Sequence, residues 1–206
     1  NLLLGYAPEK AATTHPAVVE GVIALLRDMQ AESILIAESP GGPYYQSVLN
    51  GIYQVCGMTQ VSEKTGVPLN NDLSATEVKN PDGTACKTFH LLTPLCQADL
   101  IVNLCKLKTH ALAGMTAAAK NLFGAIPGIE KFEMHARYPD PSLFFRMLTE
   151  LNLTIDRLCP VIHICDAIVG MEGNGPSGGA PRPIGCLITS RNPFCLDLAA
   201  AGIILP

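Results

Sequence analysis

Short apolar runs that alternate with helical patterns are the feature of this sequence that most restricts its fold. Four runs have the length of buried strands: 33–37, 99–104, 160–169 and 184–189. Helical patterns separate or follow them: 16–29, a segment from the Pro40–Pro43 turn to about Cys56, 113–123, 140–158 and a last helix from Pro193. The alternation predicts a three-layer α/β fold, with helices on both faces of a largely parallel or mixed sheet.

Residues 61–95 do not continue this alternation of apolar runs and helical patterns. The turn sequence Asn80-Pro81-Asp82-Gly83 lies between two short extended segments, which predicts a β-hairpin or small β insertion. There is no internal repeat and no low-complexity linker. We therefore expect residues 1–206 to form a single α/β domain that carries this insertion.

Charge and apolar content exclude two kinds of partner. The net charge is -4, which argues against nucleic acid because phosphate binding needs a broad basic face. No apolar run approaches the ~18 residues that span a membrane, so no membrane insertion is expected. The eight cysteines show no CxxC spacing and are predicted to be reduced thiols, which indicates a cytoplasmic protein. The oligomeric state is left open.

Basic residues gather in one part of this acidic chain, and an anionic ligand is the ordinary reason. Lys106, Lys108 and His110 leave the second strand at i, i+2 and i+4, so an extended chain points them the same way. Together with Lys131 they predict a site for a phosphate, a carboxylate or an acidic cluster. The alternative is a solvated strand end with its lysines reaching into water.

Lys120 and Asn121 follow an alanine-rich segment that would approach another backbone closely. A desolvated Lys120 becomes a candidate nucleophile or base, whereas the alternative is a lysine that stabilises a helix C-terminus. His135 is a candidate titrating group or metal ligand. We expect Lys120, His135 and His110 to serve chemistry, with Asn121 among the ligand-binding residues.

An acidic set forms the counterpart. Asp166 interrupts an apolar strand and needs a partner, Glu172 and Asn174 lie on a glycine-rich loop, and Asp197 lies in the first turn of the last helix. Asp166, Glu172 and Asp197 would hold a divalent cation or orient the lysines, with Asn174 in ligand binding. Since parallel strands present their carboxyl ends at one edge, Glu38, 106–110 and 166–174 are expected to gather there.

Several of these residues belong to motifs with a family resemblance. The motifs are Thr14-His15-Pro16; Lys106–His110, Thr116, Lys120–Gly124, Pro127-Gly128, Lys131 and His135; Asp166–Pro176; and Asn192-Pro193 with Asp197. They resemble the domain-of-unknown-function family 362 over nearly the whole chain. Members are often iron–sulfur proteins, so the resemblance implies 4Fe–4S clusters in a ferredoxin-like segment. No such cysteine motif is present, and we expect the chain to be a fragment of a longer protein.

A more distant likeness concerns the order of Lys120, Pro127-Gly128 and His135. This order is similar to that of the nickel-pincer lactate racemases, in which a lysine tethers the cofactor and a histidine assists the metal. It would make Lys120 the attachment point.

Three functional hypotheses follow. The first is an enzyme domain for a small anionic molecule, redox-active if a ferredoxin-like segment supplies electrons. The second is a non-enzymatic module that docks such a segment or a redox partner through its basic patch. In the third, the lysines form purely structural buried ion pairs with the acidic set.

Overall fold

A four-stranded mixed sheet forms the centre of the protein. The computed structural model describes residues 5–111 and 113–204. The sheet has the order β4-β3-β5-β6, built from β3 (Ile101–His110), β4 (Gly114–Thr116), β5 (Val161–Glu172) and β6 (Ala180–Ser190). β3 and β5 are parallel, while the β3–β4 and β5–β6 pairs are antiparallel. The predicted α/β fold is confirmed, with the mixed form of the sheet.

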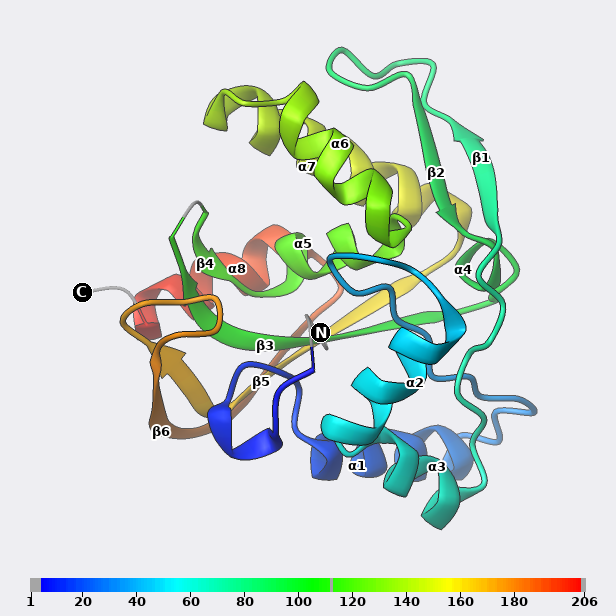
Figure 1. Cartoon of the computed structure of the whole chain (residues 1–206), viewed down its shortest axis with the longest axis vertical. Helices are drawn as coiled ribbons and strands as arrows, with labels where there is room; N and C mark the ends of the chain where they lie inside the picture. The colour runs from blue at the N-terminus through cyan, green and yellow to red at the C-terminus, as the bar shows by residue number, and fades with distance from the viewer. Residues whose placement is uncertain (1–4, 112, 205–206) are drawn as a thin grey trace.

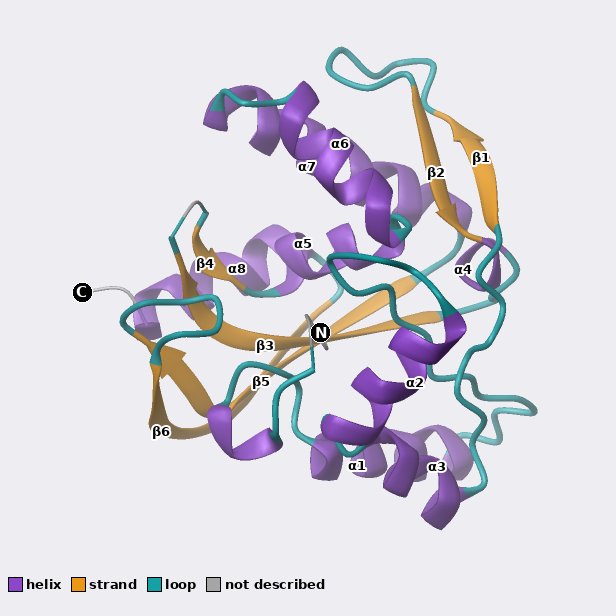
Figure 2. Cartoon of the chain, in the orientation of Figure 1, coloured by secondary structure: helices purple, strands orange, loops and turns teal. Residues whose placement is uncertain are grey.

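Helices lie on both sides of this sheet (Figures 1 and 2). Their bounds are η1 (Pro8–Lys10), α1 (Pro16–Asp28), α2 (Gln46–Val55), α3 (Met58–Thr65), α4 (Thr93–Cys96), α5 (Ala118–Asn121), η2 (Leu122–Ala125), α6 (Gly128–Arg137), α7 (Pro141–Leu158) and α8 (Pro193–Ile204). One apolar cluster joins α5 and α8 to β3 and β5, and another joins α1, α2 and α3 with Leu104 of β3 packed against it. The layers follow from the two-residue period of β3.

The alternation along β3 decides which residues meet which layer. Cys105 and Leu107 are fully buried in the cluster with α5 and α8. Lys106 and Lys108 alternate with them and contact the opposite side, where Lys108 Nζ donates a hydrogen bond to the carbonyl of Ala12. A strand of this pattern is apolar toward one helix layer and cationic toward the N-terminal segment.

The predicted hairpin is also confirmed. β1 (Ala75–Lys79) and β2 (Thr88–Leu92) pair antiparallel as a separate two-stranded sheet. The carboxylate of Glu150 on α7 ties down the hairpin loop by accepting hydrogen bonds from the backbone N–H groups of Thr84, Ala85 and Cys86. Beneath it, Phe89 and Leu91 of β2 join the core formed with α6 and α7.

Two predicted elements are wrong. Residues 33–37 form no strand of the central sheet, and Ile36 makes only an isolated bridge to Leu69. Ile34 and Ile36 instead pack against the cluster of α1, α2 and α3, so this run is apolar for packing and not for strand pairing. Residues 113–123 were expected to form one helix, but Gly114–Thr116 pair with β3 and helix begins only at Ala118.

The remaining predicted helices are observed close to their expected bounds. In α7, the side chain of Asp140 accepts a hydrogen bond from Leu143 N at 3.0 Å, and Pro141 occupies the first turn, as its sequence predicts. Among the helices that the structure describes, none has the length and hydropathy needed to cross a bilayer.

The Glu150 anchor predicts a pH-dependent loss of stability. Burial raises the pKa of Glu150, but its hydrogen bonds outweigh this and leave the pKa below its usual value. Its contribution is therefore present above the unfolded-state pKa and is lost as the pH falls through the folded-state pKa. We expect Glu150→Gln to lower the free energy of unfolding by about 1–3 kcal/mol at pH 7, and by less below about pH 4, in urea titrations.

The exposed Glu63→Gln is the matched control and should be near neutral. An equal effect of both substitutions would show that the Glu150 carboxylate does not anchor the hairpin.

Candidate functional site

Lys108, His110, Lys120, Lys131 and His135 form a basic cluster in the tertiary structure, named here the lysine–histidine cluster. β3 supplies Lys108 and His110, α5 supplies Lys120, and α6 supplies Lys131 and His135. The positive charge of Lys120 contributes to lowering the pKa of each of the other four. The cluster draws on 28 residues of chain, from 108 to 135.

Lys108 is buried at the end of β3. Its Nζ donates to the Ala12 carbonyl at 2.6 Å. Burial lowers the pKa of Lys108 to about 8, and the charges of Lys120 and Lys106 act in the same direction while Glu38 opposes them. Lys108 is therefore mostly cationic at pH 7 and loses its charge as the pH rises through about 8.

Lys120 is half-buried at the end of α5. Its Nζ lies 4.7 Å from the ring centroid of Phe123 and 5.7 Å from that of Phe144. In the described part of the chain, this amine has no hydrogen-bond acceptor and no carboxylate partner. Burial lowers the pKa of Lys120 to about 8. The amine is thus cationic at neutral pH and easily deprotonated above it.

His135 lies against the same two aromatic rings. Its ring stacks on Phe144 at 4.7 Å and meets Phe123 edge-on at 5.3 Å. Burial and then the charge of Lys120 lower the pKa of His135, so its imidazole is neutral at pH 7. His110 is similar, with a pKa lowered to about 4 by burial and by the charges of Lys120, Lys108 and His135. Two neutral imidazoles therefore accompany the lysines.

Lys131 joins the cluster to the loop before α2. Its Nζ donates to the carbonyl and hydroxyl of Ser39 and, at 3.2 Å, to the carbonyl of Pro40. Burial lowers the pKa of Lys131 to about 7, with Glu38 opposing and Lys120 adding to the shift. Gly128 opens α6 where a Cβ would meet the Gly42 carbonyl at 2.3 Å, so only glycine permits this loop contact.

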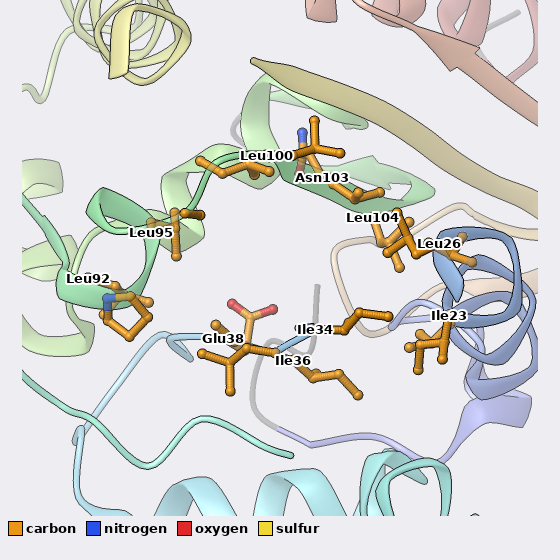
Figure 3. A pocket seen from close by; sticks show the side chains of 18 of the residues that line it. Ile23, Leu26, Ile34, Ile36, Glu38, Leu92, Leu95, Leu100, Asn103 and Leu104 are labelled. Atoms are coloured by element: carbon orange, nitrogen blue, oxygen red, sulfur yellow. The ribbon is translucent and has the colours of Figure 1, made fainter. Parts of the chain in front are cut away.

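Glu38 stands between the cluster and a cavity of about 690 Å³. Figure 3 shows its carboxylate directed into this cavity, among Ile36, Leu95 and Leu104. The wall opposite β3 is the 31–38 segment, which includes residues 33–37 that were expected to form a strand. Glu38 Oε1 accepts a hydrogen bond from Ser39 N at 2.9 Å, and its negative charge acts on Lys108 and Lys131.

Lys106 has a different role from its neighbours. Its Nζ forms a 2.7 Å ion pair with Asp166 Oδ2, and these residues face each other in the parallel β3–β5 register. Both are almost fully buried, at 1% and 0% exposure. Asp166 also accepts hydrogen bonds from the backbone N–H groups of His15 and Ile168. This pair matches the purely structural hypothesis, whereas the three lysines of the lysine–histidine cluster form no carboxylate ion pair with the residues that the structure describes.

The other predicted site residues are not brought into the cluster's centre. Glu172 forms a surface ion pair with Arg182, and Asn174 is exposed on the β5–β6 loop. Asp197 accepts hydrogen bonds from the N–H groups of Ala118 and Ala119, and burial raises its pKa to about 6 against these bonds. Asn121 donates to Asn103 and to the Leu104 carbonyl and lines the cavity.

Asp166, Glu172 and Asp197 therefore do not form the expected cation site in this structure. Among the described residues, no group of three or more His, Cys, Asp or Glu side chains is arranged to hold a metal ion. The same holds for iron–sulfur ligation, since the cysteines are distributed over separate apolar clusters, with Cys56, Cys86 and Cys105 each in a different one. The cysteines of this domain therefore do not form an iron–sulfur ligand set.

The gathering of strand ends is partly observed. The loop after β5 lies against the end of β3, where Thr109 Oγ1 donates to the Gly173 carbonyl and Ala111 N to that of Gly175. This contact places Asn174, next to Gly175, on the same side of the fold as the end of β3.

Sequence reasoning missed the groups that hold the lysines in place. These are the Ala12 carbonyl, Ser39, Phe123 and Phe144. Backbone carbonyls carry no signal in side-chain patterns, and aromatic residues in α7 are indistinguishable from ordinary core residues. The Thr14-His15-Pro16 motif gave a usable signal, because Thr14 Oγ1 and His15 N donate hydrogen bonds to Leu104 within β3 and to Asp166 within β5.

Comparison with known proteins identifies the family to which the chain belongs. Residues 1–202 match the model of the family described as Domain of unknown function (DUF362), and the chain belongs to this family. It is 31% identical over 205 residues to a thylakoid-associated protein from Synechocystis sp.. The alignment covers 99% of the chain and 61% of the relative, so the chain spans less than two thirds of that relative's length. The family resemblance inferred from the motifs is confirmed.

The buried pair predicts a large stability effect. Lys106→Met leaves Asp166 charged and buried, and should cost about 3–5 kcal/mol of unfolding free energy. The double variant Lys106→Met/Asp166→Asn should lose less than the sum of the single variants, because neither charge is then left alone. Chemical denaturation measures both.

Arg182→Met removes the exposed pair with Glu172 and serves as the control, with an expected loss of about 0–1 kcal/mol. Additive losses in the double variant would contradict the role given to Lys106.

The environment of Lys120 predicts an unusual titration. Competitive acetylation followed by peptide mass spectrometry should give a midpoint for Lys120 near pH 8, since burial favours the neutral amine. The exposed Lys64, paired with Glu20 at the surface, is the internal control amine. A shared midpoint for both amines would show that Lys120 is not desolvated.

Proposed function

We propose that this domain binds a small carboxylate- or phosphate-bearing molecule in the lysine–histidine cluster and acts on it as an enzyme domain. The observation that carries the proposal is the position of Lys120, a cation without an acceptor among the described residues and surrounded by four other basic groups. Like charges held together without a counterion repel each other, and an anion removes that repulsion. The single negative charge of Glu38 does not neutralise the three lysines of the cluster.

The residues divide into two roles in this proposal. Lys108 and Lys131 are tied to backbone carbonyls and hold the anionic group by charge. Lys120 and His135 lie together over Phe123 and Phe144 and serve the chemistry. Lys106 stays with Asp166 and supports the strands.

Burial argues for a small ligand over a protein partner. Lys106 and Lys108 are 1% exposed and Lys131 is 7% exposed, so they form little of the surface that would steer an acidic ferredoxin. The docking alternative nevertheless makes a distinct prediction, which is partner binding that weakens steeply with salt and no small-molecule binding.

Redox chemistry is an extension of the proposal. The family resemblance implies a ferredoxin-like iron–sulfur segment, and such a segment on a longer protein would supply electrons to this domain. The residues described here neither hold a cluster nor identify its position.

Anion titration tests the proposal directly. We expect phosphate, lactate or malonate to bind the wild-type chain in calorimetry, and Lys120→Met to weaken the binding by about tenfold or more, equivalent to ~1.4 kcal/mol. Lys64→Met is the matched control and should bind like wild type. Absence of binding by all three anions, or equal binding by both variants, would refute the site.

The pH dependence of this binding has a definite sign. Burial lowers the pKa of Lys108 and Lys120 to about 8, so both carry charge below that pH and lose it above. The association constant should therefore fall between pH 7 and pH 9, and measurements at both values check it. An unchanged constant would show that these amines do not bind the anion.

A further inference from the structure

The four lysines of this region differ in how their amines are engaged. Lys106 is paired with a carboxylate, Lys108 donates to one carbonyl, and Lys131 donates to two carbonyls and a hydroxyl. The amine of Lys120 lies over the rings of Phe123 and Phe144 and has no hydrogen-bond acceptor among the residues that the structure describes. An aromatic face stabilises a cation modestly but accepts no proton, so it does not hold the amine in its protonated form as a carboxylate does.

Access separates Lys120 from Lys108 and Lys131 as well. Lys108 and Lys131 are buried, whereas Lys120 is half-buried and keeps part of its side chain open to solvent. Burial still lowers its pKa to about 8. A large share of this amine is thus neutral, nucleophilic and reachable at mildly basic pH.

We infer that Lys120 forms an imine with the carbonyl group of a small 2-oxo acid whose carboxylate is held by the neighbouring lysines. This inference rests on the proposed function and names the class of its ligand. An anion with an adjacent carbonyl uses both properties of the site, the fixed cations and the unengaged amine.

The step balances without an outside reagent. The lone pair of the neutral Nζ forms a bond to the carbonyl carbon, and the carbonyl electron pair moves to oxygen, which takes a proton. The nitrogen then loses one proton, and the hydroxyl takes a second proton and leaves as water while the nitrogen lone pair forms the C=N bond. The nitrogen finally releases its remaining proton to give the neutral imine. The sum is amine plus ketone giving imine plus water, with no change in oxidation state.

His135 is the group placed to move the proton. Its ring contacts the same two phenylalanines as Lys120, and its lowered pKa keeps it neutral and able to accept a proton. The charged or titratable groups around Lys120 are Lys108 and His110 from β3, Lys131 and His135 from α6, and Glu38 beside Lys131. The cations of this set favour the carboxylate of the 2-oxo acid.

Reductive trapping tests the inference. The wild-type chain is incubated at pH 8 with pyruvate, glyoxylate or 2-oxoglutarate and sodium cyanoborohydride, and the modified lysines are mapped by peptide mass spectrometry. With pyruvate, Lys120 should carry one carboxyethyl group. At pH 8 a pKa of about 8 leaves roughly 100 times more neutral amine than an ordinary lysine pKa. Trapping at Lys120 should therefore exceed that at exposed Lys64 by about tenfold or more.

Two variants and two competitors complete the design. Lys120→Arg keeps the charge but should abolish the trapped product, whereas Lys64→Arg should leave it intact. Phosphate or lactate, which lack a ketone, should compete with trapping in the wild-type chain. Equal labelling of Lys120 and Lys64 by all three 2-oxo acids overturns the inference.

Lactate calorimetry on the same protein separates the two conclusions. If lactate binds and no 2-oxo acid is trapped at Lys120, the imine is wrong and the proposed anion site remains. If phosphate, lactate and malonate all fail to bind and nothing is trapped, both are wrong.

Discussion

The parallel pairing of β3 and β5, with the Lys106–Asp166 ion pair across it, is the interaction on which the rest of the structure depends. Asp166 also binds the backbone of His15, so the pair connects two central strands to the segment that begins α1. Two buried charges are tolerated because each has its opposite at 2.7 Å and further hydrogen bonds complete the carboxylate. Without the negative charge of Asp166, burial of the Lys106 ammonium on this side of β3 would be strongly unfavourable.

The lysine–histidine cluster lies beside this ion pair, but its amines outnumber its carboxylates. Its lysines are desolvated and its histidines are kept neutral, with Glu38 as the acidic group whose charge acts on Lys108 and Lys131. Burying amines in excess of carboxylates is unfavourable for folding, and the fold offsets it with carbonyl acceptors for Lys108 and Lys131. Lys120 is left on two aromatic faces. A bound anion would offset the unfavourable free energy of burying this unpaired cation.

Much of the fold could be predicted from sequence patterns, and the failures have identifiable causes. The hairpin followed from Asn80-Pro81-Asp82-Gly83, and α7 from its capping residues, because turn and cap chemistry is local. The prediction of a strand at 33–37 was wrong, because an apolar run indicates only that a segment is buried and not that it pairs with a strand edge. The helix predicted over 113–123 was wrong at 113–116, because pairing with β3 overrode the helix propensity of a glycine- and alanine-containing segment.

For the candidate site, the sequence by itself determined the residue types and the alternation that sends Lys106 and Lys108 to one side of β3. It also determined family membership, since each motif is defined by residue types and their spacing along the chain. Only the tertiary structure decided that Lys106 is neutralised while Lys120 is not, and that Asp166, Glu172 and Asp197 have separate partners. The physical reason is that desolvation and charge pairing depend on distances between atoms far apart in the chain, which spacing along a sequence does not specify.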